Sequence, residues 1–321
     1  MTYKTGNANA DIAANTIVVG GETPAADTAF DIQSTNGGIL IPRVTEATRD
    51  AFASAPPKLV YDVTDMEYVV SKSVVTPFQG AAWSGDGSKL YMTSVTGTQT
   101  VTQYNLSTPY KLSTMVDSGL TLDTSPLVSP IRGIWAKPDG TALFVAGVHS
   151  GNTVVRKWSM VEGQLSSAVD LANQFQVSPT IIRPDGVYMN PAGTELYVTE
   201  NYPLQKITQI TLSTPWLPSS GSVTGSLDTS VGNVVDYPLN LHIVPDGTRA
   251  IVSGIRDSDG EGLVVHYTLS TPELISSGTH DTTTTLTAPP SYDPGGIHFH
   301  PNGKRIFFHD NGDNDMLEYT T

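Results

Sequence analysis

The sequence predicts an all-β fold, a five-bladed β-propeller that follows a small β-rich N-terminal module. A tight turn followed by an alternating apolar strand occurs five times, and the turn glycines are Gly87, Gly140, Gly193, Gly247 and Gly303. Successive turn glycines are 53, 53, 54 and 56 residues apart. A repeat of about 50 residues that holds four strands matches one propeller blade. A spare strand before the first repeat supplies the strand that the last repeat lacks.

Composition limits the class of protein. The chain has 321 residues, no cysteine, a formal net charge of −14 and only 15% charged residues. These values argue against a nucleic acid or a membrane as a partner, and they exclude a disulfide framework and thiol chemistry. No apolar run reaches the ~18 residues of a membrane helix, and residues 1–6 do not begin a secretory signal. We expect a soluble protein that would reach the outside of a cell by another route, such as particle assembly and lysis.

Residues 1–65 are predicted to form the N-terminal module. Residues 1–30 are small and polar, so they are interpreted either as a flexible tail or as a peg that orders on a partner. Residues 35–52 predict a turn, a short strand and one or two helical turns with Thr45 as the N-cap. Pro56 and Pro57 end that helix, and residues 58–65 form a strand that leads into the propeller.

Each repeat is expected to contribute strands A to D. Strand A ends at the turn, where Pro presets φ at the first position and Gly supplies a positive φ before the chain reverses. Strand B follows, with apolar and aromatic residues alternating with polar ones. Seven positions before every turn glycine stands a small or turn-prone residue, which suits a strand crowded against its symmetry mates near the axis. These residues are Gly80, Gly133, Gly186, Asn240 and Gly296.

The last two strands of each repeat are less regular. Strand C carries Tyr104, Trp158, Ile210, Tyr267 or Tyr319, and strand D follows it, after a Ser-Thr-Pro phrase in three repeats, over residues 111–122, 164–175, 222–231 and 273–286. The fifth repeat stops at the end of strand C, so residues 66–75 are predicted to close the ring as its strand D. The propeller domain then spans residues 66–321, with blades near 76–125, 126–178, 179–232, 233–288 and 289–321.

Residues 34–65 resemble a module that is common in bacteriophage fibre and other virion proteins. The shared features are a Gly-rich strand, an Ile-Pro-Arg-Val-Thr phrase, an Arg-Asp-Ala helix and a Leu-Val-Tyr strand. They are carried by Gly37, Gly38, Ile41, Pro42, Arg43, Thr45, Arg49, Asp50, Ala51, Pro57, Leu59, Val60 and Tyr61. The resemblance implies location in a virion and docking on capsid or tail proteins, for which we name Ile41, Pro42, Arg43, Arg49 and Phe52. Such modules are often trimeric, which implies a homotrimer.

The propeller repeats resemble the YVTN type, in which an Asp-Gly turn is followed by a Leu-Tyr-Val-Thr strand. Residues 197–201, Tyr-Val-Thr-Glu-Asn, are the closest copy. This resemblance supports the fold alone, because propellers carry many functions.

Acidic residues gather after strand B in the last two repeats. Residues 257–262 alternate oxygen donors around a glycine, and residues 309–315 form a second acidic cluster. Calcium prefers six to eight oxygen ligands. Asp310, Asp313 and Asp315 are the candidate calcium ligands, and solvated hairpin turns are the simpler interpretation of both stretches. No other cofactor is expected.

Aromatic and imidazole side chains recur at two positions. His242 and His298 stand five residues before their turn glycines, where the other repeats have Ala82, Trp135 and Tyr188. This ring position could line the mouth of the central channel and hold a metal or a sugar ring, or it could be ordinary packing. Tyr110 and Trp216 follow a Ser-Thr-Pro phrase as exposed loop aromatics, which could stack on sugars or fill gaps between blades. These residues, Tyr110, Trp216, His242 and His298, are the candidate ligand-binding residues.

No residues are assigned a catalytic role. Asp185, Asp236 and Asp293 lie at or near strand A in successive repeats and could supply the paired carboxylates of a glycoside hydrolase. The corresponding positions of the first two repeats carry Gln79 and Arg132, and no nucleophile elbow, P-loop or dinucleotide motif occurs.

Three functions follow from these observations. The first is a non-enzymatic bacteriophage structural protein, a fibre, spike or head decoration that docks by its N-terminus and displays a propeller for binding host surface glycans. The second is a polysaccharide-degrading enzyme on the same fold. The third is a bacterial surface scaffold propeller.

Overall fold

The computed structural model describes residues 66–74, 78–94, 99–178, 183–201, 203–231, 234–286, 294–310 and 312–320. The chain divides into two units between residues 57 and 58, and the description below concerns the second. The proposed docking residues, from Ile41 to Phe52, lie outside the described residues. Within the described part of the chain, no helix has the length and apolar character needed to cross a membrane.

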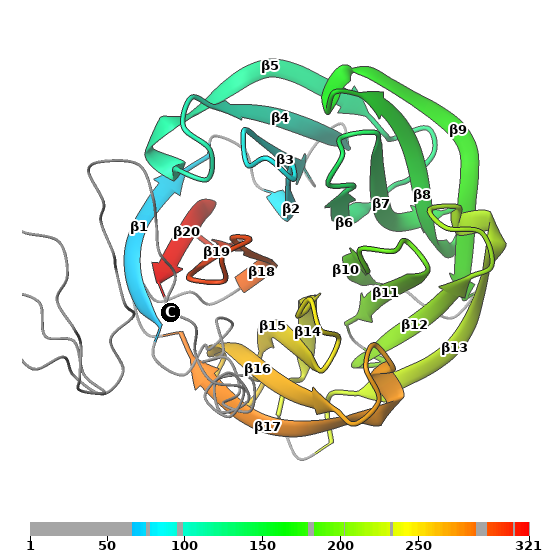
Figure 1. Cartoon of the computed structure of the whole chain (residues 1–321), viewed down its shortest axis with the longest axis vertical. Coiled ribbons are helices and arrows are strands. Elements are labelled where there is room, and N and C mark those ends of the chain that lie inside the picture. Colours follow the sequence, from blue (N-terminus) through cyan, green and yellow to red (C-terminus); the bar gives the residue numbers. More distant parts are fainter. Residues whose placement is uncertain are drawn as a thin grey trace, which may run out of the picture. The chain divides into compact units, whose positions relative to one another are not determined.

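Five four-stranded antiparallel sheets surround a central axis, so the predicted five-bladed propeller is confirmed (Figure 1). The first strand of each blade is innermost and the fourth is outermost. Blade one consists of β2 (Phe78–Trp83), β3 (Lys89–Ser94), β4 (Thr100–Leu106) and β5 (Met115–Asp123), and blade two of β6 (Ile131–Ala136), β7 (Ala142–His149), β8 (Asn152–Val161) and β9 (Gln164–Ser178). Blade three consists of β10 (Pro184–Met189), β11 (Glu195–Glu200), β12 (Lys206–Leu212) and β13 (Gly221–Asp228). Blade four consists of β14 (Tyr237–Ile243), β15 (Arg249–Ile255), β16 (Gly262–Leu269) and β17 (Gly278–Thr285).

Blade five is completed by a strand from the other end of the propeller sequence. Its strands are β18 (Pro294–Phe299), β19 (Arg305–Asp310) and β20 (Asp315–Thr320), and β1 (Glu67–Ser73) pairs with β20 in antiparallel register. Tyr68 faces Tyr319 across this pair, with their ring centroids 5.8 Å apart. The strand expected to close the ring therefore does so: main-chain hydrogen bonds hold β1 in blade five, and the chain then continues from β1 into blade one.

The turns between the first and second strands explain the repeated glycine. Each turn glycine donates its N–H to the carbonyl three residues earlier, at 2.7–2.9 Å. All five have φ between 67° and 73°, which a residue without a Cβ adopts at little cost. In four of the five turns the Asp or Asn before the glycine accepts a hydrogen bond from the backbone N–H two residues on, as from Thr141 to Asp139 at 2.9 Å; the third turn has Ala192 there. This arrangement fixes the hairpin register.

The inner strands approach each other closely at the small residues. A Cβ on Gly133 would lie 2.9 Å from the carbonyl carbon of Gly186, and one on Gly186 would lie 2.5 Å from the carbonyl oxygen of Leu239. Real Cβ atoms essentially never approach other atoms within 3.0 Å. The expectation of crowding near the axis is therefore confirmed, and glycine is required by the neighbouring blade rather than by φ.

A repeated hydrogen bond joins each of blades one to four to the blade before it in the ring. In each of these blades, a residue shortly before the fourth strand has a positive φ and donates its N–H to the carbonyl of the turn glycine of the same blade. These residues are Tyr110, Gly163, Trp216 and Glu273. The carbonyl of each accepts a hydrogen bond from a side chain of the preceding blade, contributed by Arg305, Tyr91, Lys157 and Tyr197 respectively, at 2.5–2.9 Å. The blades are thus linked at the same point around most of the ring.

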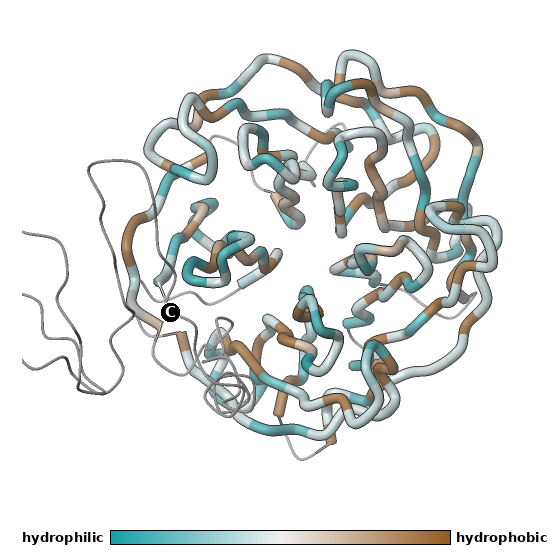
Figure 2. Tube along the Cα trace, in the orientation of Figure 1, coloured by the Kyte–Doolittle hydropathy of each residue, from teal (hydrophilic) through white to brown (hydrophobic). Residues whose placement is uncertain are grey.

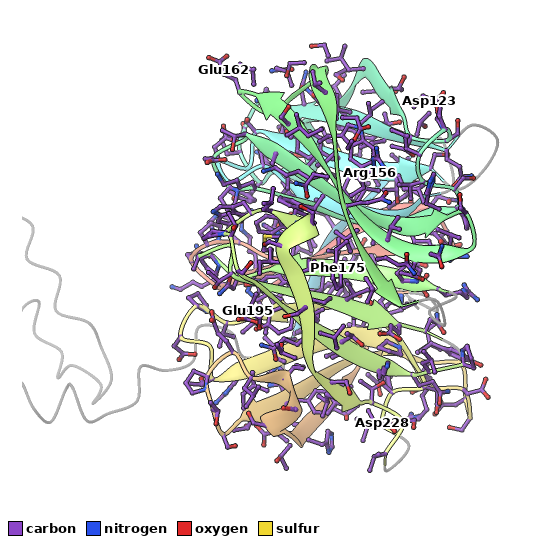
Figure 3. The ribbon with its side chains drawn as sticks, turned by 90° about the vertical axis from the view of Figure 1, so that its right-hand side faces the viewer. Asp123, Arg156, Glu162, Phe175, Glu195 and Asp228 are labelled. Atoms are coloured by element: carbon purple, nitrogen blue, oxygen red, sulfur yellow. The ribbon has the colours of Figure 1, made fainter. Side chains whose placement is uncertain are left out.

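The core lies between the blades, and hydrophobic residues recur along the strands of every blade (Figure 2). Outer strands start after short 3-10 turns, Leu112–Thr114, Pro218–Ser220 and Ile275–Ser277, in blades one, three and four. Blade two instead has a two-residue turn, and its long β9 carries Asp170, which binds Arg156 through two hydrogen bonds of 2.8 and 2.6 Å. Arg156 and Phe175 of this blade are labelled in Figure 3.

Candidate functional site

One mouth of the central channel is lined by the predicted ring position. Ala82, Trp135, Tyr188, His242 and His298, at the far ends of the five inner strands, all border one cavity of about 160 Å³. Trp83, Ile134, Met189 and Leu241 add apolar surface. The tight turns after the inner strands hold these side chains at the same height around the axis. The site is therefore an apolar and aromatic cup with two imidazoles in its wall.

Both histidines of this cup are neutral near physiological pH. Burial lowers the pKa of His242 to about 4. Burial, with the nearby His242 and His300, lowers the pKa of His298 to about 3. Aromatic rings surround them, since the His242 ring centroid lies 4.8 Å from that of Phe299 and the His298 ring stacks at 6.0 Å on Tyr110. Uncharged imidazoles suit contact with a neutral ligand better than with an anion.

The two loop aromatics both pack over the turn glycine of their own blade but differ in exposure. Tyr110 is only 5% exposed, so the expectation that it is an exposed loop residue is wrong. Its ring covers Gly87 and its hydroxyl donates to the Gly85 carbonyl at 2.9 Å, because the turn glycine leaves room for it. Trp216 is partly exposed, stacks on Trp135 with centroids 5.9 Å apart, and extends the aromatic wall toward the rim. Of the two roles considered for Tyr110, its burial favours packing between blades over contact with a ligand.

The opposite mouth of the channel is polar. Gln79, Arg132 and Asp185 stand at equivalent positions near the start of successive inner strands. Arg132 donates from one guanidinium nitrogen to Gln79, 2.5 Å away, and to Asp185, 3.0 Å away. The other Asp185 oxygen accepts from Asn201 at 2.6 Å. A cavity of about 190 Å³ lies beside this chain of side chains, so the two mouths differ in chemistry.

The acids considered for glycoside hydrolysis do not form a pair in the described residues. Asp185 is buried and its charge is balanced by Arg132. Asp236 accepts the Asp257 N–H at 2.7 Å on an exposed loop, and Asp293 lies outside the described residues. A general acid must reach the substrate with its carboxyl group, and both oxygens of Asp185 are already bound by Arg132 and Asn201.

The acidic loops show two different arrangements. In the loop of residues 257–262, Arg256 forms an ion pair with Asp259 at 2.5 Å, which balances one of the negative charges of the loop. In the second, burial raises the pKa of Asp310, and the charges of Asp313 and Asp315 raise it further. No group of three His, Cys, Asp or Glu side chains that could hold a metal occurs in the described ranges. Calcium binding by Asp310, Asp313 and Asp315 stays a prediction.

Sequence reasoning missed Trp83, and it did not predict that Gln79, Arg132 and Asp185 would bind one another. Trp83 packs on Phe307, with centroids 4.7 Å apart, and borders the aromatic cup. Gln79, Arg132 and Asp185 were aligned by their spacing from the turn glycines, and that alignment was itself the signal that they would be neighbours. Equal spacing in adjacent blades of a propeller places side chains next to each other around the axis.

A family model described as a phage tail-like trimerisation region matches residues 18–112. The match covers the predicted N-terminal module from residue 18 onward and continues through β4. It supports a phage structural role at the level of the family description. A comparison with curated proteins gives no significant match.

Solved structures resemble the propeller at low sequence identity. Glutaminyl cyclase from Myxococcus xanthus has a TM-score of 0.51 and 14% identity, covering 79% of this chain and 95% of that one. Periplasmic gluconolactonase from Pseudomonas aeruginosa has a TM-score of 0.47 and 15% identity, with 76% and 66% covered. Hydrazine synthase from Kuenenia stuttgartiensis has a TM-score of 0.42 and 19% identity, with 74% and 56% covered. The chain thus spans less than two thirds of the last two, and the similarity concerns the fold alone.

Proposed function

We propose that this chain is a non-enzymatic structural protein of a phage tail or fibre, assembled as a homotrimer on the virion. The observation that carries the proposal is the match of residues 18–112 to a phage tail-like trimerisation region. The N-terminal part, 1–65, then docks on other virion proteins through Ile41, Pro42, Arg43, Arg49 and Phe52. The propeller follows as the displayed part.

The propeller suits display because its ring is closed. β1 pairs with β20, and side chains of preceding blades bind carbonyls of the next, so relative motion of the blades breaks hydrogen bonds. Unpaired sheet edges promote association with other chains. A closed ring keeps its inner strands from such pairing and holds its loops at fixed positions, which is what a repeated binding platform requires.

We further propose that the aromatic cup binds host surface glycans. Trp135 and Tyr188 border the cavity and offer ring surface against which the apolar face of a sugar can pack. His242 and His298 are uncharged there. The cavity, about 160 Å³, is small, so binding by one copy is weak. Three copies per trimer and many trimers per virion raise the overall avidity without any new contact.

The test uses particles assembled from the genome that encodes the chain. Particles are produced with the full chain or with a chain that lacks residues 1–60, and their proteins are quantified by mass spectrometry. The proposal predicts that the full chain is a stoichiometric component of the particle and that the shortened chain is absent, although it is made and folded in the same cells. Absence of the full chain from particles, or equal incorporation of both, contradicts the proposal.

A further inference from the structure

A cavity on the outer side of blade three is separate from the central channel. It has a volume of about 450 Å³, more than twice that of either channel mouth. Its wall combines the end of β9 in blade two with β11, β12 and β13 of blade three. Phe175 and Asp228, labelled in Figure 3, mark β9 and the end of β13. The residues that matter below are Val177, Glu200, Lys206, Thr208, Val223 and Ser226.

Glu200 lies where the alternation of β11 predicts an apolar side chain. Leu196 and Val198 share its face of the strand and pack in the core between blades two and three. Glu200 is only 1% exposed, and one of its oxygens accepts a hydrogen bond from the Thr208 hydroxyl. Burial raises its pKa, whereas the hydrogen bond from Thr208 and the charge of Lys206 lower it. A carboxyl group at this position therefore needs a reason beyond packing.

The second oxygen of Glu200 is the polar atom that the cavity leaves unsatisfied. Oε2 has no hydrogen-bond partner among the described residues. The Lys206 ammonium lies 3.7 Å from it, which is beyond the 2.7–3.2 Å typical of N–H···O bonds. Buried polar atoms are nearly always hydrogen-bonded, so each exception requires an explanation. An additional group beside these two atoms would satisfy Oε2 and also contact the ammonium.

The chemistry of such a group is restricted by its two neighbours. It must donate to a carboxylate oxygen and accept from an ammonium, and a hydroxyl does both with one oxygen atom. Lys206 stands at the rim with 32% of its side chain exposed, so it can swing outward to admit this hydroxyl. Ser226 offers a further hydroxyl, while Val177 and Val223 offer apolar contact to C–H groups. This combination fits a sugar ring.

We infer that this cavity is a second carbohydrate subsite, in which Glu200 and Lys206 bind a hydroxyl of a neutral hexose unit. The inference rests on the glycan-binding part of the proposed function, and it adds a site on the side of the ring, away from the aromatic cup. The chain's formal charge of −14 disfavours an anionic ligand. Glu200 and Lys206 balance each other, so the subsite selects hydroxyl groups rather than charge.

The test measures binding of methyl α-D-glucopyranoside and methyl α-D-galactopyranoside to the full chain by saturation-transfer NMR and titration at pH 7. We expect millimolar affinity for at least one probe. Lys206→Met should weaken it at least ten-fold, because the bound hydroxyl loses its charged donor. Lys111→Met, an exposed lysine of blade one, serves as the matched control and should bind like the unmodified chain.

Glu200→Gln provides a second variant at the floor of the cavity, with thermal melting as the check on folding. It should also weaken binding while leaving a cooperative melt. No saturation transfer to either probe, or equal affinity of Lys206→Met and Lys111→Met, overturns the inference. Loss of binding in Trp135→Ala with full binding in Lys206→Met assigns the sugar to the aromatic cup and also overturns it. None of these three results bears on incorporation into particles, so this inference and the proposed role in the virion fail separately.

Discussion

The inner ring of the propeller predicts a large effect for a single methyl group, in the substitution Gly186→Ala. A Cβ at this position would lie 2.5 Å from the Leu239 carbonyl oxygen and 2.7 Å from the Asn240 Cα. Both are backbone atoms, so no rotamer change relieves the contact. The third neighbour, the Thr199 hydroxyl at 2.7 Å, donates to the same Leu239 carbonyl. The methyl group therefore pushes β10 and β14 apart and disturbs the hydrogen bond from Thr199 of β11 to Leu239 of β14.

The magnitude follows from these contacts. Overpacking of this kind costs about 1–3 kcal/mol, and a weakened hydrogen bond adds about 1 kcal/mol. Alanine also lowers the conformational entropy of the unfolded chain, which raises the free energy of unfolding by about 0.4–1 kcal/mol. The free energy of unfolding should therefore fall by about 1–3.6 kcal/mol. The melting temperature should then fall by roughly 2–14 °C, since about 2–4 °C corresponds to 1 kcal/mol in a domain of this size.

Gly225→Ala is the matched control for this prediction. Gly225 lies in β13 of the same blade, and its closest neighbour to an added Cβ is a flexible serine hydroxyl at 3.3 Å. Urea titration and thermal melting of both variants at pH 7 compare the same chemical change at the axis and at the rim. Equal stability of the two variants, within about 0.5 kcal/mol, would refute the crowding of the inner ring.

Three further predictions concern the closure, the polar mouth and the histidines. Ser73→Cys with Asp315→Cys should form an intramolecular disulfide, seen by mass and by non-reducing electrophoresis, because the two residues face each other across β1 and β20 and the chain has no other cysteine. Arg132→Met should lower the free energy of unfolding by about 3–5 kcal/mol, since Asp185 is left buried without its cation; adding Asp185→Leu should restore most of it in urea titrations. Between pH 6.5 and about 3 the unfolded chain binds a proton at His298 that the folded chain does not, so acidification favours unfolding. The free energy of unfolding, measured by melting between pH 7 and 4.5, should depend less steeply on pH in His298→Phe than in the unmodified chain. The difference in slope should reach up to about 1.4 kcal/mol per pH unit.

Local signals in the sequence predicted much of the fold. The turn glycines and their spacing gave the blade count, because the turn requires a positive φ and each sheet needs about the same length of chain. The absent strand in the last repeat and the spare strand before the first one predicted the closure. By contrast, the 3-10 turns that precede β5, β13 and β17 leave little trace in composition, since Ser and Pro also suit open loops.

The candidate sites were predicted less completely, because they depend on which side chains neighbouring blades bring together. The ring position of His242 and His298 could be aligned by counting from the turn glycines. The burial of Tyr110 could not, since it depends on the space that Gly87 leaves beneath its ring. Glu200 was seen only as part of a Tyr-Val-Thr-Glu-Asn phrase. Its place on the apolar face of β11 follows from alternation with Val198, but the cavity around it depends on where β9 of the neighbouring blade ends.

The mass of the full chain in solution tests the proposed trimeric assembly most directly. One chain has a mass of 34.1 kDa, so a homotrimer has a mass of about 102 kDa. Native mass spectrometry should find the trimer at low micromolar concentration. A chain that begins at residue 66, which lacks the N-terminal module, should form a smaller fraction of trimer at the same concentration. A full chain that stays at the mass of one copy throughout the micromolar range would contradict the account.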